Sequence, residues 1–232
     1  MFDHFSAGAC TWPYVTFSGD DSLTQVNRAG GAFPLLVRSY VPERRTSRHL
    51  PENATKKRAL PLSRVYGLLE PGPVLLVTTA RKGKTNIMAQ SWHCMMEFEP
   101  PLVGCLISGR NHSFDALLAT RECVLNIPTA KLLDKVIGVG NCSGRKVDKF
   151  ARFGLTSKPA ELVGAPLVDE CYASLECRVA DTRMVNRYNF FVLKVVKAWI
   201  DPKLKEPRTL HHRGQGRFMV AGRTIRTASR VK

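Results

Sequence analysis

From residue 60 onward the chain is a succession of short, β-rich apolar runs, each ended by glycine, proline or a polar turn. Strands that follow one another at such short intervals pair as antiparallel hairpins, so this punctuation strongly constrains the fold. Residues 74–79 and 85–92 flank a Lys82-Gly83-Lys84 turn and are predicted to form the first hairpin. Further strands are predicted at 101–108, 123–127, 172–181, 188–200 and 218–221, and helices at 62–69, 113–119 and 130–139. The pattern indicates a mainly β fold, a barrel with helical inserts.

Residues 1–57 differ from the rest, with scattered Gly, Ser, Arg and Pro and no sustained period of two or of 3.6. They are predicted to be a disordered or loosely attached N-terminal extension. Two alternatives stay open: a start placed too far upstream, or an arm that wraps a partner subunit. The folded domain is expected over residues 58–226, followed by a basic tail at 227–232.

The formal net charge of +16 raises the question of a nucleic-acid partner. Much of the excess lies near the two ends, because residues 203–232 hold nine basic side chains against one acidic, and residues 44–58 hold six more. The aromatic-studded basic groove of a nucleic-acid-binding module is missing from this pattern. The charge therefore indicates solvated termini, and it is also compatible with a basic rim that attracts phosphorylated cofactors.

No apolar run in the sequence is long enough to cross a bilayer, and the N-terminus lacks the basic-then-apolar pattern of a secretory signal. The chain is therefore expected to be a cytoplasmic protein with no membrane partner. Its seven cysteines are an odd number and form no CxxC pair. They indicate reduced thiols used as small core residues, with no disulfide framework and no metal site.

Six motifs in this order resemble the flavin reductase-like FMN-binding family, whose members include flavoredoxin, archaeal ferric reductase and the small reductase components of two-component monooxygenases. They are PVLLVTT at 73–79, NIMAQSW at 86–92, FEPPLVG at 98–104, SGRNHSF at 108–114, VLNIP at 124–128 and SGRKVDKF at 143–150. The last is similar to the flavoredoxin branch in particular. The resemblance covers roughly residues 58–226. It implies an FMN-binding split β-barrel and a homodimer with the flavin at the subunit interface.

Residues 108–114 suit the flavin phosphate. Arg110 can donate two parallel hydrogen bonds, and Ser113 lies near the start of the predicted helix, where backbone amides are free. The alternative interpretation, which needs no resemblance, is a helix N-cap beside a surface arginine. With the resemblance, the segment contributes Ser108, Arg110, His112 and Ser113 to the predicted FMN site.

The resemblance assigns the flavin ring and ribityl chain mainly to one predicted strand, through Asn86, Ile87, Met88, Ala89, Gln90, Ser91 and Trp92. Alternate side chains of a strand share a face, which groups Asn86, Met88, Gln90 and Trp92. The alternative is an ordinary barrel strand whose methionine and tryptophan belong to the core.

Three other segments add candidates. In the flavoredoxin branch the loop at 142–150 approaches the flavin from the dimer partner, so Lys146 and Lys149 are candidates for the flavin or nicotinamide phosphates, and Ser143 is a further candidate for cofactor binding. The alternative for this loop is a charged connection between helices. Asn126 either lies near the flavin or caps the next helix, and His212 is a candidate for the nicotinamide or substrate pocket.

No Ser-His-Asp, Cys-His or paired-carboxylate arrangement is readable from the spacing. That agrees with a flavin enzyme, because hydride transfer from nicotinamide to flavin N5 needs orientation rather than a catalytic acid or base. The expected function is that of an NAD(P)H-dependent FMN reductase, with FMN as cofactor and NADH or NADPH as donor. The alternative is a flavoredoxin-type electron carrier that accepts electrons from a redox protein partner. A nucleic-acid-binding module is a remote third.

Overall fold

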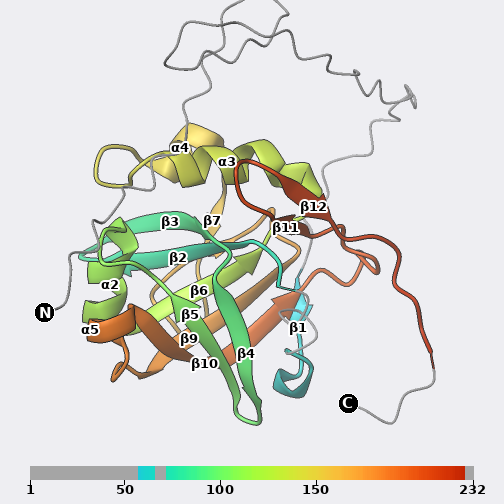
Figure 1. Cartoon of the computed structure of the whole chain (residues 1–232), viewed down its shortest axis with the longest axis horizontal. Coiled ribbons are helices and arrows are strands. Elements are labelled where there is room, and N and C mark those ends of the chain that lie inside the picture. The colour runs from blue at the N-terminus through green and yellow to red at the C-terminus, as the bar shows by residue number, and fades with distance from the viewer. Residues whose placement is uncertain (1–56, 66–71, 228–232) are drawn as a thin grey trace, which may run out of the picture. The chain divides into compact units, whose positions relative to one another are not determined.

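The computed structural model of the protein describes residues 57–65 and 72–227 (Figure 1). The predicted extension at 1–57 and the predicted tail at 227–232 lie outside these residues, apart from Lys57 and Thr227. Lys57 is held by the fold, since its Nζ donates to the Val168 carbonyl at 2.6 Å and to Ser174 Oγ at 3.3 Å.

Eight strands form one antiparallel sheet, which confirms the prediction of a mainly β fold. The order across the sheet is β3-β2-β6-β9-β10-β5-β4, and β1 pairs with β10 beyond this path. The strands are β1 (Arg58–Ala59), β2 (Leu75–Arg81), β3 (Lys84–Gln90), β4 (His93–Phe98), β5 (Pro101–Leu106), β6 (Glu122–Ile127), β9 (Ala173–Asp181) and β10 (Phe190–Ile200). Two smaller sheets pair β7 (Ser157–Lys158) with β8 (Leu167–Val168) and β11 (Leu210–His212) with β12 (Phe218–Val220).

The first hairpin forms where the sequence predicts it. β2 and β3 pair until Arg81 meets Lys84, which leaves Lys82 and Gly83 as a two-residue turn. Both turn residues have positive φ, 50° and 74°. Turns of this kind have a backbone twist that matches the right-handed twist of the flanking strands.

The sheet curls into an open barrel. Its two edge strands, β3 and β4, are joined by only Ser91 and Trp92, so the edges must meet at this end. The side-chain amide of Gln90 strengthens the junction by donating to the carbonyls of Trp92 and Leu106. Elsewhere along the described strands no ladder joins β3 to β4, and the barrel stays split.

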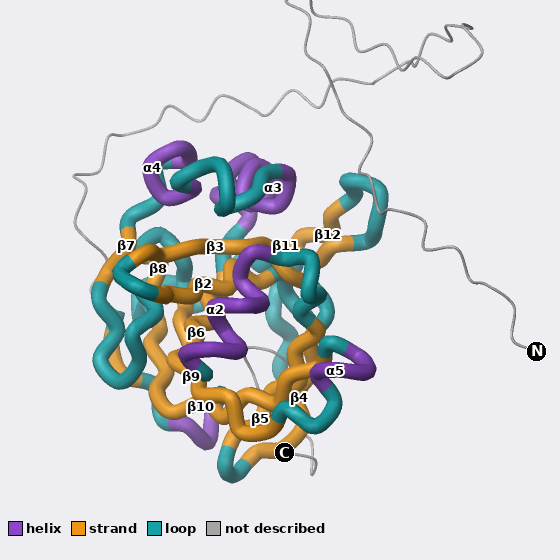
Figure 2. The backbone as a smooth tube through the Cα atoms, turned by 90° about the vertical axis from the view of Figure 1, so that its left-hand side faces the viewer, coloured by secondary structure: helices purple, strands orange, loops and turns teal. Residues whose placement is uncertain are grey.

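Helices fill the opening and cover one side. α2 (His112–Thr120) lies across the opening of the curled sheet and packs against β2 and β3 (Figure 2). The main core between them includes the fully buried Leu117 and Phe191. On the other side of β2 and β3, a second cluster that includes Leu76, Val136 and Leu210 joins α3 (Leu133–Asn141), α4 (Lys149–Phe153) and the β11–β12 hairpin.

The remaining helical elements are short. The predicted helix at 62–69 is described only as the 3-10 turn η1 (Leu62–Arg64), and residues 66–71 lie outside the described part. The predicted helix at 130–139 is divided into η2 (Ala130–Leu132) and α3. α5 (Val185–Tyr188) was not predicted. Among the described helices, none combines the length and apolar character that a bilayer span requires.

Two further elements escaped the sequence analysis for identifiable reasons. β4 lacks a regular alternation because a β-bulge at Met96 shifts its register against β5. α4 begins at Lys149, inside the segment predicted as a loop, and Asp148 caps it by accepting from the Ala151 amide at 3.1 Å. Its five residues are too few to show helical periodicity.

Candidate functional site

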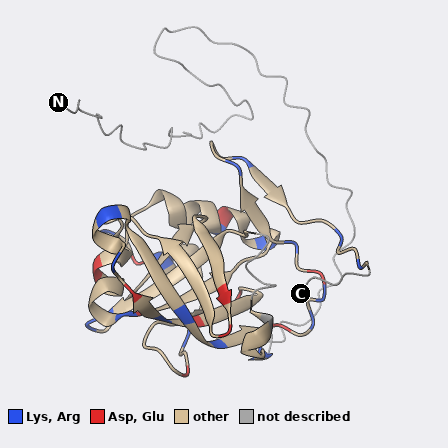
Figure 3. Cartoon of the chain, turned by 60° about the horizontal axis from the view of Figure 1, so that its bottom comes forward, with Lys and Arg blue, Asp and Glu red and all other residues tan. Residues whose placement is uncertain are grey.

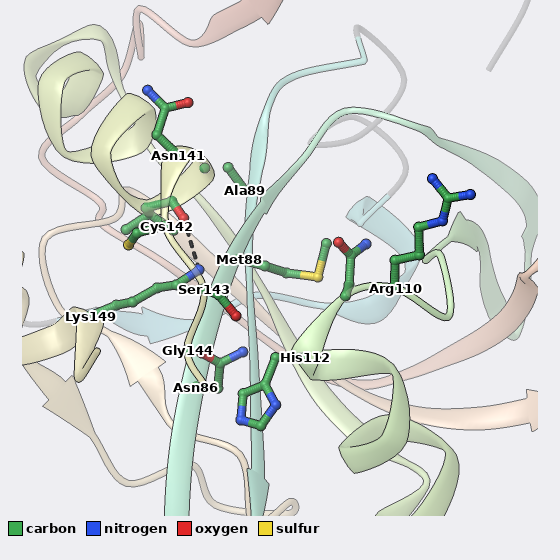
Figure 4. A pocket seen from close by; sticks show the side chains of 13 residues that line it. Asn86, Met88, Ala89, Arg110, His112, Asn141, Cys142, Ser143, Gly144 and Lys149 are labelled. Carbon is green, nitrogen blue, oxygen red and sulfur yellow. Dashed lines mark hydrogen bonds between the residues drawn. The ribbon is translucent and has the colours of Figure 1, made fainter. Parts of the chain in front are cut away.

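A cavity of about 310 Å³ lies along β3, between the start of α2 and the connection from α3 to α4 (Figure 4). This volume is at the lower end of the range of roughly 300–1,000 Å³ that is usual for small-molecule sites. The lining residues are Asn86, Met88, Ala89, Arg110, Asn111, His112, Val139, Gly140, Asn141, Cys142, Ser143, Gly144 and Lys149.

β3 forms the central wall of the cavity. Met88 and Ala89 leave the strand on opposite sides, Met88 towards the start of α2 and Ala89 towards the end of α3 (Figure 4). The amide of Asn86 is buried and donates to Ser113 Oγ at 2.8 Å, which ties the strand to the first turn of α2.

The backbone of β3 also faces the cavity, because β3 is an edge strand. Arg81 and Lys84 close the hairpin turn as a hydrogen-bonded pair, and bonded and non-bonded pairs alternate along an antiparallel ladder. The N–H and C=O groups of Ile87 and Ala89 therefore point away from β2, towards the open edge. A planar ligand lying along this edge can hydrogen-bond to the backbone without disrupting the sheet.

The start of α2 supplies donors for an anion. Asn111 precedes the helix in an extended conformation, with no side-chain cap on the first amides. The free N–H groups and the positive end of the helix dipole therefore favour a negative ligand group here. Arg110 is exposed beside them and is free to fork onto an oxyanion.

The opposite wall carries a buried amine. Lys149 is 6% exposed, and its Nζ donates to the Val139 carbonyl at 2.8 Å near the end of α3. Burial lowers the pKa of this amine, and the nearby Cys142 thiol partly offsets the effect. No carboxylate occurs among the lining residues in the part of the chain that is described, so the cavity is electrostatically suited to an anion.

Gly144 brings this wall against β3 and α2. A Cβ atom at Gly144 would overlap the side-chain amide of Asn86 and would lie 3.0 Å from His112 Cδ2. Only glycine allows the loop to approach so closely, and the contact closes one end of the cavity.

The structure brings together seven of the residues predicted to bind cofactor: Asn86, Met88, Ala89, Arg110, His112, Ser143 and Lys149. Ile87 has its side chain in the second hydrophobic cluster, and Ser113 lies beneath Asn86. Ser91, Ser108 and Lys146 are absent from the lining.

Four other predicted residues lie elsewhere in the fold. Gln90 holds the junction between the sheet edges. Asn126 is fully buried, and its amide bonds to the Leu76 carbonyl and the Val168 N–H, so it neither lines the cavity nor caps a helix. Trp92 is 68% exposed, which makes the alternative of a core tryptophan wrong. His212 lies on the β11–β12 hairpin, with its ring 5.2 Å from that of Phe218.

Sequence reasoning missed a group of lining residues: Asn111, Val139, Gly140, Asn141, Cys142 and Gly144. Their signal was weak. The small residues Gly138, Val139 and Gly140 lie where the end of α3 approaches β3.

The sequence matches the flavin reductase-like domain over residues 68–219. The chain belongs to the flavin reductase-like family. Among its relatives is the uncharacterized protein YddH of Escherichia coli K12, which is 30% identical over 172 residues that cover 68% of this chain and 91% of that protein. The cavity of this flavin reductase-like domain thus lies within the matched region.

Solved structures confirm the fold of this flavin reductase-like chain. The FMN-binding domain of a flavin reductases-like enzyme from Shewanella baltica superposes with a TM-score of 0.72 at 24% identity, covering 76% of this chain and 100% of that one. The flavoredoxin of Methanosarcina acetivorans superposes with a TM-score of 0.59 at 26% identity, covering 68% of this chain and 89% of that one.

Proposed function

We propose that the cavity binds FMN. The observation that carries this proposal is the combination, in one cavity, of an edge strand with free backbone groups and a basic helix start. The phosphate would lie on the free amides of α2 and on Arg110, and the isoalloxazine ring would lie along Ile87–Ala89. The FMN-binding relative from Shewanella baltica supports the same ligand.

The proposed reaction is hydride transfer from NADH or NADPH, with the bound flavin supplying the electron-accepting ring. The residues of this chain would bind and orient the two partners. Arg110 and the α2 amides would neutralise phosphate charge, and the buried Lys149 would add a positive charge on the facing wall. No lining side chain is needed as a proton donor or acceptor for the hydride step itself. Such a reaction fits the cytoplasm, where both nicotinamide nucleotides are available.

The visible spectrum tests the cofactor first. Purified protein incubated with FMN and passed through a desalting column is expected to keep a flavin absorbance band in the protein fraction. Anaerobic NADH or NADPH is then expected to bleach this band rapidly, which a stopped-flow experiment follows. A colourless protein fraction would end the proposal of FMN binding, and a stable yellow one would end the proposal of nicotinamide-dependent reduction.

A flavoredoxin-type electron carrier is the second candidate. It is favoured by the likeness to the Methanosarcina acetivorans flavoredoxin and by the segment 143–150, which contributes Ser143, Gly144 and Lys149 to the cavity. A carrier would keep its FMN band in the presence of either nucleotide and lose it only when a reduced redox protein is added.

A further inference from the structure

Two basic side chains stand at the edge of the cavity without lining it. Arg145 and Lys146 follow Gly144 directly on the loop between α3 and α4, and both are exposed. Neither side chain forms a salt bridge with a carboxylate of the described residues. Lysines and arginines are spread over several parts of the described chain (Figure 3), so the position of this pair next to the lining residues Ser143 and Gly144 is what distinguishes it.

The loop that carries this pair is held in place. The Lys146 N–H donates to the Ser143 carbonyl at 3.1 Å, and the Arg145 N–H donates to Ser143 Oγ at 3.3 Å, which closes a tight turn. Gly144 rests against Asn86 of β3 (Figure 4), where a Cβ atom would overlap the side-chain amide. The two basic side chains therefore extend from a backbone that is already ordered, so binding a ligand there costs little backbone entropy.

The electron donor of the proposed reaction has to extend past the cavity. A volume of about 310 Å³ is at the lower end for small-molecule sites and leaves little room beyond one ligand. In the proposed function the FMN phosphate would occupy Arg110 and the free amides of α2. The nicotinamide of the donor must reach the flavin ring, whereas its adenosine half has to lie outside. With the α2 side occupied, the loop with Arg145 and Lys146 is the basic surface that remains beside the cavity.

The one carboxylate of this loop is already in use. In dinucleotide-binding folds, an acidic residue typically accepts from the ribose 2′-hydroxyl of NADH, whereas an arginine accommodates the 2′-phosphate of NADPH. Asp148 is the only acidic residue between Cys142 and Lys149, and it caps α4 by accepting from the Ala151 amide at 3.1 Å. An unpaired arginine beside an engaged carboxylate is the combination that suits a 2′-phosphate.

We propose that the donor is NADPH rather than NADH, and that Arg145 and Lys146 bind its 2′-phosphate. The guanidinium of Arg145 can donate two parallel hydrogen bonds to the phosphate oxygens, and the ammonium of Lys146 adds a second positive charge. The buried Lys149, deeper in the same wall, would face the pyrophosphate that both nucleotides share and would not distinguish them. The inference rests on the proposed function, because it takes nicotinamide-dependent reduction of the flavin as given.

A matched pair of adenosine nucleotides tests the 2′-phosphate site apart from the flavin reaction. Adenosine 2′,5′-bisphosphate and 5′-AMP differ only in the 2′-phosphate, and excess FMN keeps both off the proposed phosphate site at α2. Isothermal titration of wild type should give the bisphosphate an affinity about tenfold higher, the lower end of the scale for a hydrogen bond between charged groups. Arg145→Ala should bring the ratio of the two affinities close to one.

Arg152→Ala is the matched control for the loss of positive charge. Arg152 is exposed on α4, and its guanidinium lies over the Phe153 ring, 5.8 Å from the centroid, so it already has a contact within the chain. This variant should keep the wild-type ratio of affinities. The proposal is overturned if wild type binds the two nucleotides equally or binds neither, if Arg145→Ala keeps the ratio, or if both variants lower it alike.

Flavin reduction tests the preference itself. NADPH should reduce the FMN-loaded protein with a kcat/KM about tenfold above that of NADH. Arg145→Glu should reverse this preference, because a carboxylate repels the 2′-phosphate and accepts from the 2′-hydroxyl. Equal kcat/KM values for the two donors in wild type would overturn the inference and leave the proposed reductase intact. Reduction by neither donor, with the preference for the bisphosphate retained, would overturn the proposed reductase and support the 2′-phosphate site.

Discussion

The two edge strands of the sheet, β3 and β4, are neighbours in sequence and offer different surfaces. β3 presents free backbone groups and the buried Asn86 amide to a cavity whose other walls carry Arg110 and Lys149. β4, two residues further on, leaves Met96 exposed, and Trp92 in the connection before it is exposed as well. A closed barrel would pair these strands and remove both edges. The split therefore leaves two unlike edges, one along β3 that borders a cavity and one along β4 that has no cavity of this kind.

The largest expected effect comes from adding a side chain at Gly144, where the loop lies against β3. Gly144→Val would force the loop off Asn86, where even a Cβ overlaps. The affinity for FMN is expected to fall by more than about 100-fold, or about 2.7 kcal/mol, in a titration followed by flavin fluorescence. Gly222→Val is the control, because a Cβ there meets nothing within 4 Å. Equal affinity in the two variants would show that the loop does not shape the FMN site.

Removing the guanidinium at the same edge is expected to have the next largest effect. Arg110→Ala should weaken FMN binding by about 1.5–3 kcal/mol, the usual scale for a hydrogen bond to a charged group. Arg213→Ala is the matched control, since Arg213 is also exposed and lies on the β11–β12 hairpin, outside the cavity lining. Unchanged affinity for Arg110→Ala in isothermal titration would remove this residue from the phosphate site.

The junction between the edges is expected to affect folding rather than binding. Gln90 is 7% exposed and donates across the point where β3 passes into β4. Gln90→Ala should lower the free energy of unfolding by about 1–3 kcal/mol, because carbonyls at the junction lose a buried donor. Urea denaturation measures this change. A variant as stable as wild type would show that the two-residue connection alone holds the edges together.

The sequence predicted the strands that have strong local signals. β2 and β3 are joined by a turn whose residues have positive φ, and β10 is a long apolar run. These three strands could therefore be predicted without tertiary information. β4 was not, because the bulge at Met96 interrupts its alternation. Features that arise from pairing with a distant strand leave little trace in the local pattern.

The site was predictable only in part, for a different reason. Arg110 and Asn86 lie in motifs that the family resemblance identifies, and the fold brings them to one cavity. Gly144 lines the same cavity only because a loop some 60 residues further along the chain folds back onto β3. Gln90 and Asn126 have the polarity of ligand-binding residues, yet buried backbone groups of the protein itself use their amides. Sequence alone does not distinguish a polar group bonded to the fold from one that awaits a ligand.

The smallest expected effect concerns the β4 edge and its dependence on pH. His93 Nε2 lies 2.7 Å from the Pro73 carbonyl, and burial lowers the pKa of this imidazole below its ordinary value of 6.5. At a pH between the lower pKa of the folded protein and the ordinary pKa of the unfolded chain, His93 is protonated only in the unfolded chain. The free energy of unfolding should therefore fall as the pH drops through and below 6.5. The loss is bounded by about 1.4 kcal/mol for each unit of pKa change.

His93→Gln removes this titration while leaving the other histidines in place, so the difference between wild type and variant isolates the contribution of His93. Urea denaturation at several pH values between 7.5 and 5 should show the stability of wild type falling more steeply on acidification than that of His93→Gln. Parallel curves would mean that the imidazole is as accessible to protons in the folded protein as in the unfolded chain. Protons would then reach the inner side of β4 at His93, even though Nε2 lies against the Pro73 carbonyl. The β4 edge would differ from the enclosed β3 edge more than the static contact indicates.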